Sequence, residues 1–224
     1  IGEGGVQVKQ WDREVRSDFA IYTQIDLDKR VPDTDSTETK TIITPQQTLQ
    51  LQGNVIMKAN QGSVLSKTVL VDILRQYATL EGQDTSKEGR IKVEANLSEL
   101  ETNRKVQNTE IKTQEVETEK QEKPEQKKVL LFASSAVLDN IKHLAMFEGD
   151  VEMERTPDNL YIHAGKITLQ LNELQELQSI RAEQGVCFEQ PGRVAKAEQA
   201  NFDEIKQTIL LEGSAEVQSG KYHL

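Results

Sequence analysis

Apolar and polar residues alternate in three segments of the chain, each centred on a glycine: Gly53, Gly149 or Gly213. The residues two and four positions before and after each glycine are apolar, whereas those between them are mostly Gln, Glu, Asp, Asn and Ser. Because side chains two residues apart lie on the same face of a β-strand, the pattern predicts three strands with one apolar face each. The twelve apolar residues are Leu49, Leu51, Val55, Met57, Ala145, Phe147, Val151, Met153, Ile209, Leu211, Ala215 and Val217.

The three segments belong to an internal repeat. Residues 133–153 align without a gap on residues 197–217, and residues 49–57 carry a third copy of the glycine-centred part. The positions shared by the two longer copies include Ala136 and Ala200, Asp139 and Asp203, and Glu148-Gly149 and Glu212-Gly213. Such repetition is typical of folds in which one structural unit stacks on the next. The sequence therefore predicts an all-β protein of stacked strands.

The glycine at the centre of each strand predicts a bend, since an interior glycine usually marks a bulge or a close backbone approach. Bent antiparallel strands that stack side by side build a curved trough with an apolar inner face. The alternation leaves two interpretations of that face open: a closed core filled by its own side chains, or an open groove for an apolar ligand. Small residues at inward positions leave room inside the trough, and they are Ala136, Ala145, Ala200 and Ala215.

Polar turns are predicted between the strands. Asp139-Asn140, residues 155–159, Pro191-Gly192 and Asp203-Glu204 are rich in residues that favour turns. The two aspartates occupy equivalent positions in the repeat, so we expect the two turns that they begin to lie at the same end of the stacked strands.

Three longer segments are less regular. Residues 26–40 are rich in turn formers and predict a polar loop, and residues 77–89 are also rich in turn formers. Residues 172–184 fit two interpretations, because Leu174, Leu177 and Ile180 recur at helical spacing inside a chain that otherwise alternates. The surrounding repeat favours two strands joined by a turn.

The chain is expected to form a single domain over residues 1–224, with a polar and charged insertion at about 96–128 in a connection of the second unit. Apolar residues are sparse in this insertion, which therefore cannot bury enough surface to offset the entropy lost on ordering. A solvated loop is expected there, and a partner-binding site is the alternative.

Composition narrows the function. The chain of 224 residues has 36% apolar and 4% aromatic residues, which suits a sheet that buries one face of each strand. A net charge of −10 argues against nucleic acid and anionic membrane surfaces as partners. Cys187 is the single cysteine, which excludes an internal disulfide and a cysteine-rich metal site. The chain begins Ile-Gly rather than Met, so we expect an N-terminal signal or anchor to be missing from it.

No arrangement typical of an enzyme, a metal site or a cofactor site is found. His143, His163 and His223 lack metal-ligand spacing, and His143 aligns with Gln207 in the other copy. The repeated Asp139 and Asp203 are explained by the turns that they begin. A polysaccharide lyase built as a β-solenoid would need clustered Asp, Arg and Lys on an outer face, where the repeat has scattered Gln and Glu. We therefore expect neither catalysis nor a cofactor.

The repeated motif A-x-x-A-x-F-D-E-x-K-Q-T-I-x-L-x-G-x-A-x-V, followed by Q-x-G, resembles the OstA-like (LptA) repeat of lipopolysaccharide transport proteins. The match is close over residues 193–220, good over 129–155 and recognisable over 42–73. It is weak over 1–41 and absent from 96–128. Short motifs of this kind are degenerate, so the specificity comes from their ordered repetition.

The resemblance implies an open twisted β-jellyroll that resides in the periplasm. Proteins of this family bind lipid A acyl chains in an apolar inner groove and pass lipopolysaccharide from the inner to the outer membrane. They stack end to end as homo-oligomers and join other transport components by edge-strand addition. The strand ending at Leu224 is the expected contact with the next molecule.

Several alternatives stay open at this point. The chain is either the soluble bridge, the membrane-anchored (LptC-like) sibling, or the periplasmic domain of the outer-membrane translocon, since all three share the repeat. A structural β-repeat scaffold without lipid transport is a further alternative. The inner-face residues that the resemblance assigns to lipid binding are Val55, Met57, Leu138, Phe147, Val151, Met153, Phe202, Ile209, Leu211 and Val217.

Overall fold

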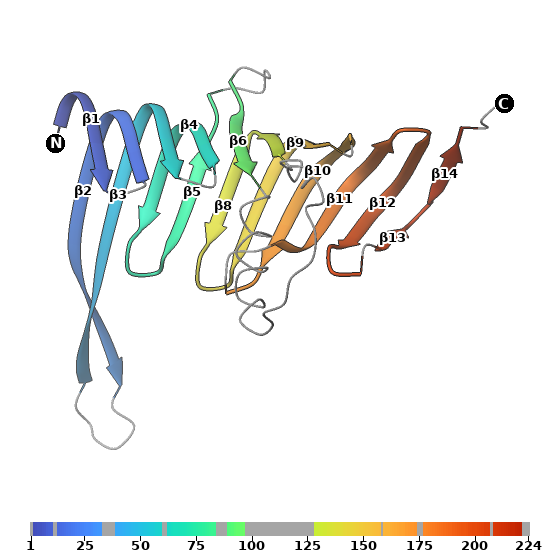
Figure 1. Cartoon of the computed structure of the whole chain (residues 1–224). Helices are drawn as coiled ribbons and strands as arrows, with labels where there is room; N and C mark the ends of the chain where they lie inside the picture. The colour runs from blue at the N-terminus through green and yellow to red at the C-terminus, as the bar shows by residue number, and fades with distance from the viewer. Residues whose placement is uncertain are drawn as a thin grey trace, which may run out of the picture.

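A computed structural model describes residues 2–10, 13–32, 39–59, 62–83, 89–96, 128–157, 159–173, 177–206 and 208–220. These residues form one antiparallel sheet of fourteen strands. Figure 1 shows the strands following one another along an elongated molecule with the two termini at opposite ends. The predicted all-β fold of stacked, bent strands is therefore confirmed. No helix long or apolar enough to cross a membrane occurs in the described ranges.

The strands are bounded as follows: β1 Gly2–Gln10, β2 Arg13–Pro32, β3 Thr39–Ala59, β4 Gly62–Asp72, β5 Tyr77–Glu81, β6 Ile91–Asn96, β7 Lys128–Ala133, β8 Ser135–Asp139, β9 Leu144–Thr156, β10 Leu160–Leu171, β11 Leu177–Gln190, β12 Arg193–Asp203, β13 Thr208–Glu212 and β14 Glu216–Ser219.

The repeated glycines form sharp corners, which confirms the predicted bends. Gly53, Gly149 and Gly213 have φ values of 72°, 83° and 70°. This left-handed backbone region is accessible to glycine at little cost and strains most other residues. The residue after each of these glycines also has a positive φ, so two consecutive residues turn the chain and the pairing register shifts beside them, as between Gln52 and Val55.

At Gly149 the corner also brings two backbones together. A Cβ atom placed on this residue would lie 2.7 Å from the Cβ of Ser134, the residue that separates β7 from β8. The Ser134 amide donates to the carbonyl oxygens of Glu148 at 3.0 Å and of Gly149 at 3.1 Å. The Ser134 hydroxyl donates to the same Gly149 oxygen at 3.0 Å. The corner therefore leaves no room for a side chain.

The corners divide the sheet into two walls. Strand β9 pairs with β7 through its residues 152–156 and with β8 through residues 144–148. In the same way, β12 pairs with β14 on one side of its bend and with β13 on the other. We call the wall that contains β6, β7 and β14 wall one, and the wall that contains β5, β8 and β13 wall two. The long strands β4 and β9–β12 contribute one half to each wall.

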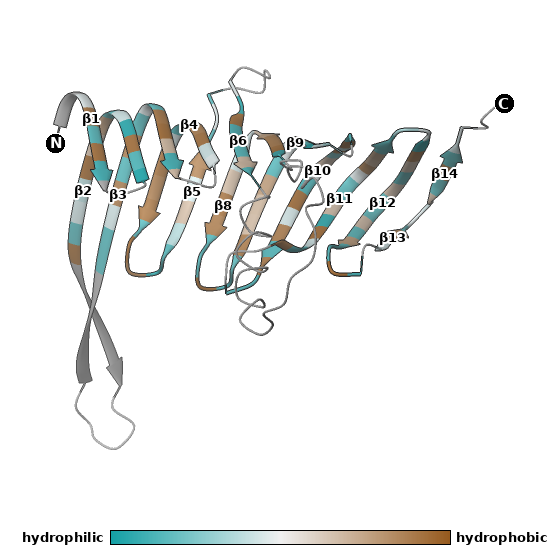
Figure 2. Cartoon of the chain, viewed as in Figure 1, coloured by the Kyte–Doolittle hydropathy of each residue, from teal (hydrophilic) through white to brown (hydrophobic). Residues whose placement is uncertain are grey.

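The apolar faces of the two walls pack against each other and form a continuous core. Figure 2 shows apolar and polar residues alternating along the strands that make up the walls. Full burial of one aliphatic side chain stabilises a fold by roughly 1.5–3 kcal/mol, so this interior dominates stability. Its largest fully buried side chains are Leu80, Ile91, Leu131, Met153, Leu160 and Ile167.

The three glycine-centred copies differ in burial. The apolar residues around Gly53 and Gly149 are buried or half-buried in the core. Around Gly213 they are largely exposed, with Ile209 at 39% and Val217 at 66% of their surface accessible. Strands β13 and β14 end the described sheet and pair on one side only, with β12. The prediction of a dry face therefore fails in the third copy, because no described strand covers it.

Strands occupy parts of the predicted loop at 26–40 and of the turn-rich segment at 77–89. Strand β2 continues to Pro32 and β3 begins at Thr39, so most of 26–40 is a paired ribbon that Figure 1 shows extending beyond the other strands. The hydrogen bonds between paired strands join backbone groups and do not depend on the side chains. A composition rich in turn formers therefore did not indicate these two strands. Within 77–89, residues 77–81 form β5. Burial of Leu80 between the walls stabilises this strand.

The remaining predictions on strands and turns are confirmed where the structure describes them. The predicted turns at 139–140, 155–159, 191–192 and 203–204 each fall where two strands join, and the ambiguous segment belongs to β11 from Leu177 onwards. Residues 97–127 of the predicted insertion lie outside the described residues, and Asn96 and Lys128 on either side of them are paired. Leu224 and His223 also lie outside the described residues.

Replacement of Gly149 by alanine is expected to destabilise the fold more than replacement of Gly185. Both glycines have left-handed φ values, but a Cβ at Gly185 would meet nothing within 4 Å. Left-handed strain alone costs about 1–2 kcal/mol, which is the loss expected for G185A. G149A adds the clash with Ser134. Urea unfolding of the two variants measures the difference, and equal losses would show that the corner is not tightly packed.

Candidate functional site

The two walls enclose an apolar cavity in the middle of the molecule. Its volume is about 250 Å³. Wall one contributes Val93, Leu131 and Met153 to its lining, and wall two contributes Leu80, Ala136 and Phe147. An engineered apolar cavity of about 150 Å³ in another protein stays dry and binds benzene. The space between these walls is therefore large enough to hold hydrocarbon.

Small residues keep the cavity open. Ala136 pairs with Phe147 across β8 and β9, and Leu138 pairs with Ala145. All four line the cavity, so each large side chain faces a small one on the neighbouring strand. The expectation that inward alanines leave room therefore holds for Ala136 and Ala145. Ala200 lines a separate hollow of only about 10 Å³, and Ala215 is exposed.

The cavity reaches the free ends of the strands, opposite the glycine corners. Asn96 ends β6, Leu171 ends β10 and Leu177 begins β11, and all three line the cavity. The part of the cavity near the glycine corners is thus enclosed by apolar side chains, and the opposite part is bordered by strand ends and turns.

The predicted site residues fall into four groups. Leu138, Phe147 and Met153 line the cavity. Phe202 and Ile209 line the small hollow beside it. Four others belong to or pack against the core but line neither space: Val55, Met57, Val151 and Leu211. Val217 is exposed at the end of the sheet, which corrects its expected position on an inner wall.

Strands β10 and β11 also line the cavity, which was not predicted from the sequence. Leu169, Leu171, Leu177 and Ile180 line the cavity on wall two. The signal was present as alternation over residues 167–171, but the helical spacing around Leu177 obscured its continuation. Val129 and Leu131 on β7 were also missed, because they lie within an uninterrupted apolar run that has no clear period.

The repeated aspartates have the structural role that the turns predict. The Asp139 carboxylate accepts a hydrogen bond from the Lys142 amide at 2.9 Å, and Asp203 accepts one from the Lys206 amide at 2.9 Å. The backbone hydrogen bond from Lys142 is the main cause that lowers the pKa of Asp139, and the side-chain hydrogen bond from Lys206 is the main cause for Asp203. Both carboxylates therefore stay ionised and hold their turns.

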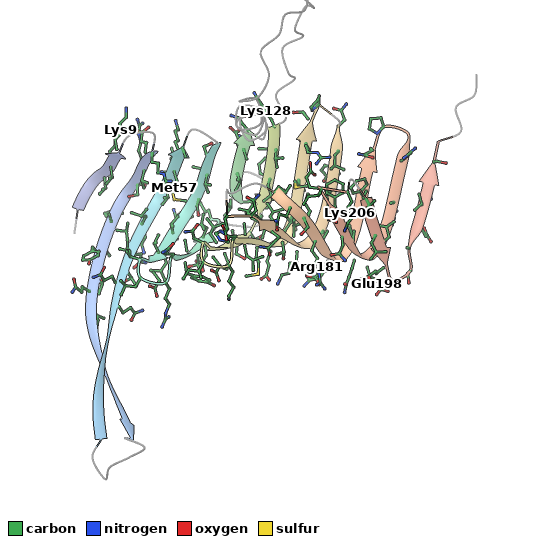
Figure 3. The ribbon with its side chains drawn as sticks, turned by 60° about the horizontal axis from the view of Figure 1, so that its bottom comes forward. Lys9, Met57, Lys128, Arg181, Glu198 and Lys206 are labelled. Atoms are coloured by element: carbon green, nitrogen blue, oxygen red, sulfur yellow. The ribbon has the colours of Figure 1, made fainter. Side chains whose placement is uncertain are left out.

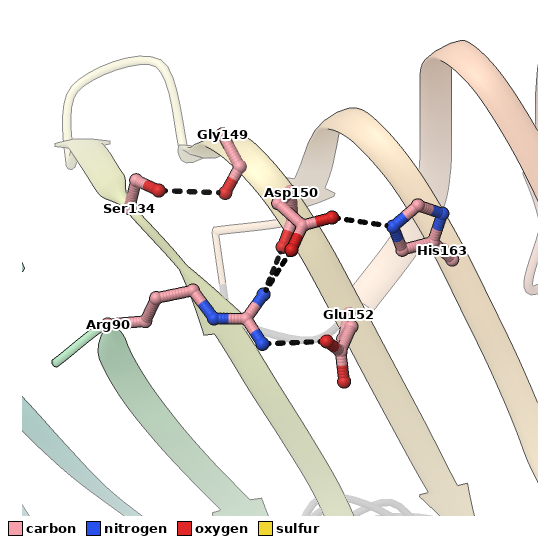
Figure 4. Close-up of polar contacts among 6 residues, drawn as sticks. All are labelled: Arg90, Ser134, Gly149, Asp150, Glu152 and His163. Carbon is pink, nitrogen blue, oxygen red and sulfur yellow. Dashed lines mark hydrogen bonds and ion pairs between the residues drawn. The ribbon is translucent and has the colours of Figure 1, made fainter. Parts of the chain in front are cut away.

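A polar cluster joins the strands on the outer face near the Gly149 corner. Figure 4 shows the Arg90 guanidinium beside Asp150 and Glu152, with His163 next to Asp150. Arg90 lies 3.2 Å from the Asp150 carboxylate and 2.6 Å from that of Glu152, and His163 Nε2 lies 2.7 Å from Asp150 Oδ1. The hydrogen bond with His163 is the largest cause that lowers the pKa of Asp150. This cluster connects strands, and within the described ranges no group of His, Cys, Asp or Glu could hold a metal ion.

A second buried arginine faces the interior. Arg155 is 7% exposed, lines the cavity, and places its Nη1 atom 3.2 Å from Glu204 Oε2. Its guanidinium carbon lies 5.4 Å from the centre of the Phe202 ring. The interior is therefore apolar except at its edge, where a cation is held between a carboxylate and an aromatic ring.

Replacement of Ala145 by leucine is expected to cost less stability than replacement of Ala164. Ala145 borders the cavity, so the added methyl groups enter existing space. Ala164 is fully buried and does not line the cavity, so its enlargement overpacks the core at a cost of about 1–3 kcal/mol. Thermal and urea unfolding of A145L and A164L provide the test. A loss of that size in both variants would mean that the cavity is already filled.

Comparison with known proteins connects part of the chain to one family. Residues 131–224 match the family model described as LptA/(LptD N-terminal domain) LPS transport protein. A search of curated proteins found no match. Among solved structures, LptH, the LptA homologous periplasmic component of the lipopolysaccharide transport device from Pseudomonas aeruginosa, is 11% identical. The alignment has a TM-score of 0.45 and covers 77% of this chain and 82% of that chain. Residues 131–224 are thus similar in sequence to a family of lipopolysaccharide transport proteins.

Proposed function

We propose that this protein binds the acyl chains of lipopolysaccharide between its two walls and carries the lipid through the periplasm from the inner to the outer membrane. The apolar cavity is the observation that carries the proposal, since fifteen of its seventeen lining residues are apolar. Eleven of the lining residues fall within residues 131–224, the part of the chain that matches the family model. The combination of an apolar space and this similarity favours a lipid carrier over a scaffold.

The apolar interior binds the acyl chains of the ligand and excludes its phosphorylated sugars. Each methylene group moved from water into the cavity contributes about 0.8 kcal/mol, so acyl chains supply most of the binding energy. The phosphorylated sugars carry negative charge and stay at the edge, because burial of a charge in an apolar interior is costly. A chain with a net charge of −10 also repels anions from most of its surface.

The ends of the sheet supply the means of assembly. Strands β13 and β14 leave apolar residues of the inner face exposed, including Ile209 and Val217. Strand β1 ends the sheet at the opposite side of the molecule, and Figure 3 shows Lys9 near this end and Glu198 near the other. Open strand edges pair readily with another chain. Head-to-tail addition of a second copy, or of another transport component, would cover this surface and continue the groove.

The family model names both LptA and the N-terminal domain of LptD. The periplasmic domain of the outer-membrane translocon is therefore the second candidate, with the same lipid in the same cavity. Fractionation of cells distinguishes them, since a translocon domain remains with outer membranes and a bridge component is released with the periplasm.

A photoreactive phenylalanine analogue at position 147 is expected to crosslink lipopolysaccharide. Phe147 lines the cavity, whereas its neighbour Glu148 points outward and pairs with Lys166 at 2.7 Å. The same analogue at position 148 is therefore a matched control. Gel mobility and mass spectrometry identify the adduct after irradiation in cells. Adducts at position 148 without adducts at position 147 would contradict binding between the walls.

A further inference from the structure

Among the described residues that line the cavity, Arg155 alone carries a charge. It follows Val151 and Met153 on β9 at the spacing of two that directs side chains inward, and all three are buried. A buried charge is costly unless it is paired. Packing alone therefore does not explain why a guanidinium lines this apolar cavity near the end of its strand.

The ion pair of Arg155 spans the two walls. Arg155 lies near the end of β9 in wall one, whereas Glu204 lies in the turn after β12 in wall two. Their 3.2 Å contact thus joins the walls at the free strand ends, over the edge of the cavity. Phe202, whose ring Arg155 covers, lines the small hollow, and Ile180 lines both spaces. Arg155 therefore lies where the two spaces meet.

We propose that Arg155 binds the phosphate group of an acylated ligand, and that the Glu204 carboxylate occupies the position of this phosphate when the ligand is absent. A guanidinium presents its donors in a planar fork that fits phosphate as well as carboxylate. Acyl chains in the cavity would bring a phosphate on the head group to the strand ends, where Arg155 lies. Exchange requires movement of a turn residue, and no core strand has to separate.

This inference rests on the proposed function, because it assigns the head group of the same lipid to a residue. It adds a source of selectivity that an apolar cavity lacks, since methylene groups do not distinguish one amphiphile from another. Because Arg155 is the one charged residue among the described residues that line the cavity, the phosphate of a bound amphiphile is expected to lie at this end of the cavity.

Arg90 provides a matched control within the same chain. It is also buried, lies 5.8 Å from the centre of the Phe132 ring, and pairs with two carboxylates. Arg90 does not line the cavity. Loss of either arginine removes a buried, carboxylate-paired guanidinium beside an aromatic ring, but only loss of Arg155 is expected to change the choice of ligand.

The test compares two amphiphiles that differ only in a phosphate, lauroyl lysophosphatidic acid and monolauroylglycerol, below their micelle concentrations. Calorimetric titration of the wild type is expected to give about tenfold or more tighter binding of the phosphate form, as for a hydrogen bond to a charged group. R155Q is expected to bind both alike, and R90Q to keep the wild-type ratio. E204Q is expected to raise the ratio, because the competing charge is gone.

The outcomes separate the two proposals. If the wild type binds neither amphiphile, the proposed function fails. Equal binding of both by the wild type, or an unchanged ratio in R155Q, overturns the role of Arg155 while acyl-chain binding stands. If R155Q does not fold, E204Q decides: a higher phosphate preference supports the role, and an unchanged or lower one overturns it.

Discussion

The left-handed corners at the repeated glycines allow one sheet to form both walls of the core. A continuous strand has one apolar face and needs a second sheet to cover it. Two consecutive residues with positive φ bend each of β3, β9 and β11, so that the half before the bend and the half after it face each other. The corner at Gly149 admits no Cβ, because the Ser134 backbone and side chain pack directly against it. One sheet thereby becomes both walls of its own core.

The choice of residues between the walls then decides whether the core is filled. Next to the corners the inward side chains fill the space, as the fully buried Val55 and Val151 do. In the middle, alanines opposite large side chains leave about 250 Å³ of apolar space. A protein interior is normally packed to the density of an organic crystal, so such a space weakens the fold unless a ligand fills it. Fold and proposed function thus depend on the same alternation of large and small residues.

Much of this architecture follows from a period of two in the sequence. The bend at Gly149, the inward Phe147 and Met153, and the turns begun by Asp139 and Asp203 are all predictable, because each depends on local chemistry and repeats. The exposure of Val217 is not predictable in this way, since it depends on which strand lies next in space. Strand β5 was not predicted, because its segment is rich in residues that favour turns. It forms a strand through its pairing with β4 and β8. The inward direction of Arg155 is predictable from its even spacing from Gly149, which continues the inner face, but residue 155 was assigned to the predicted turn at 155–159 instead.

In the proposed function, the space between the walls holds acyl chains. Native mass spectrometry of the protein purified without detergent from the periplasm of a bacterium that makes lipopolysaccharide tests it most directly. If acyl chains lie between the walls, a bound species with the mass of an acylated, phosphorylated glycolipid is expected, and it is released when the protein unfolds. Protein that is recovered entirely free of lipid, at the mass of the polypeptide alone, would contradict it.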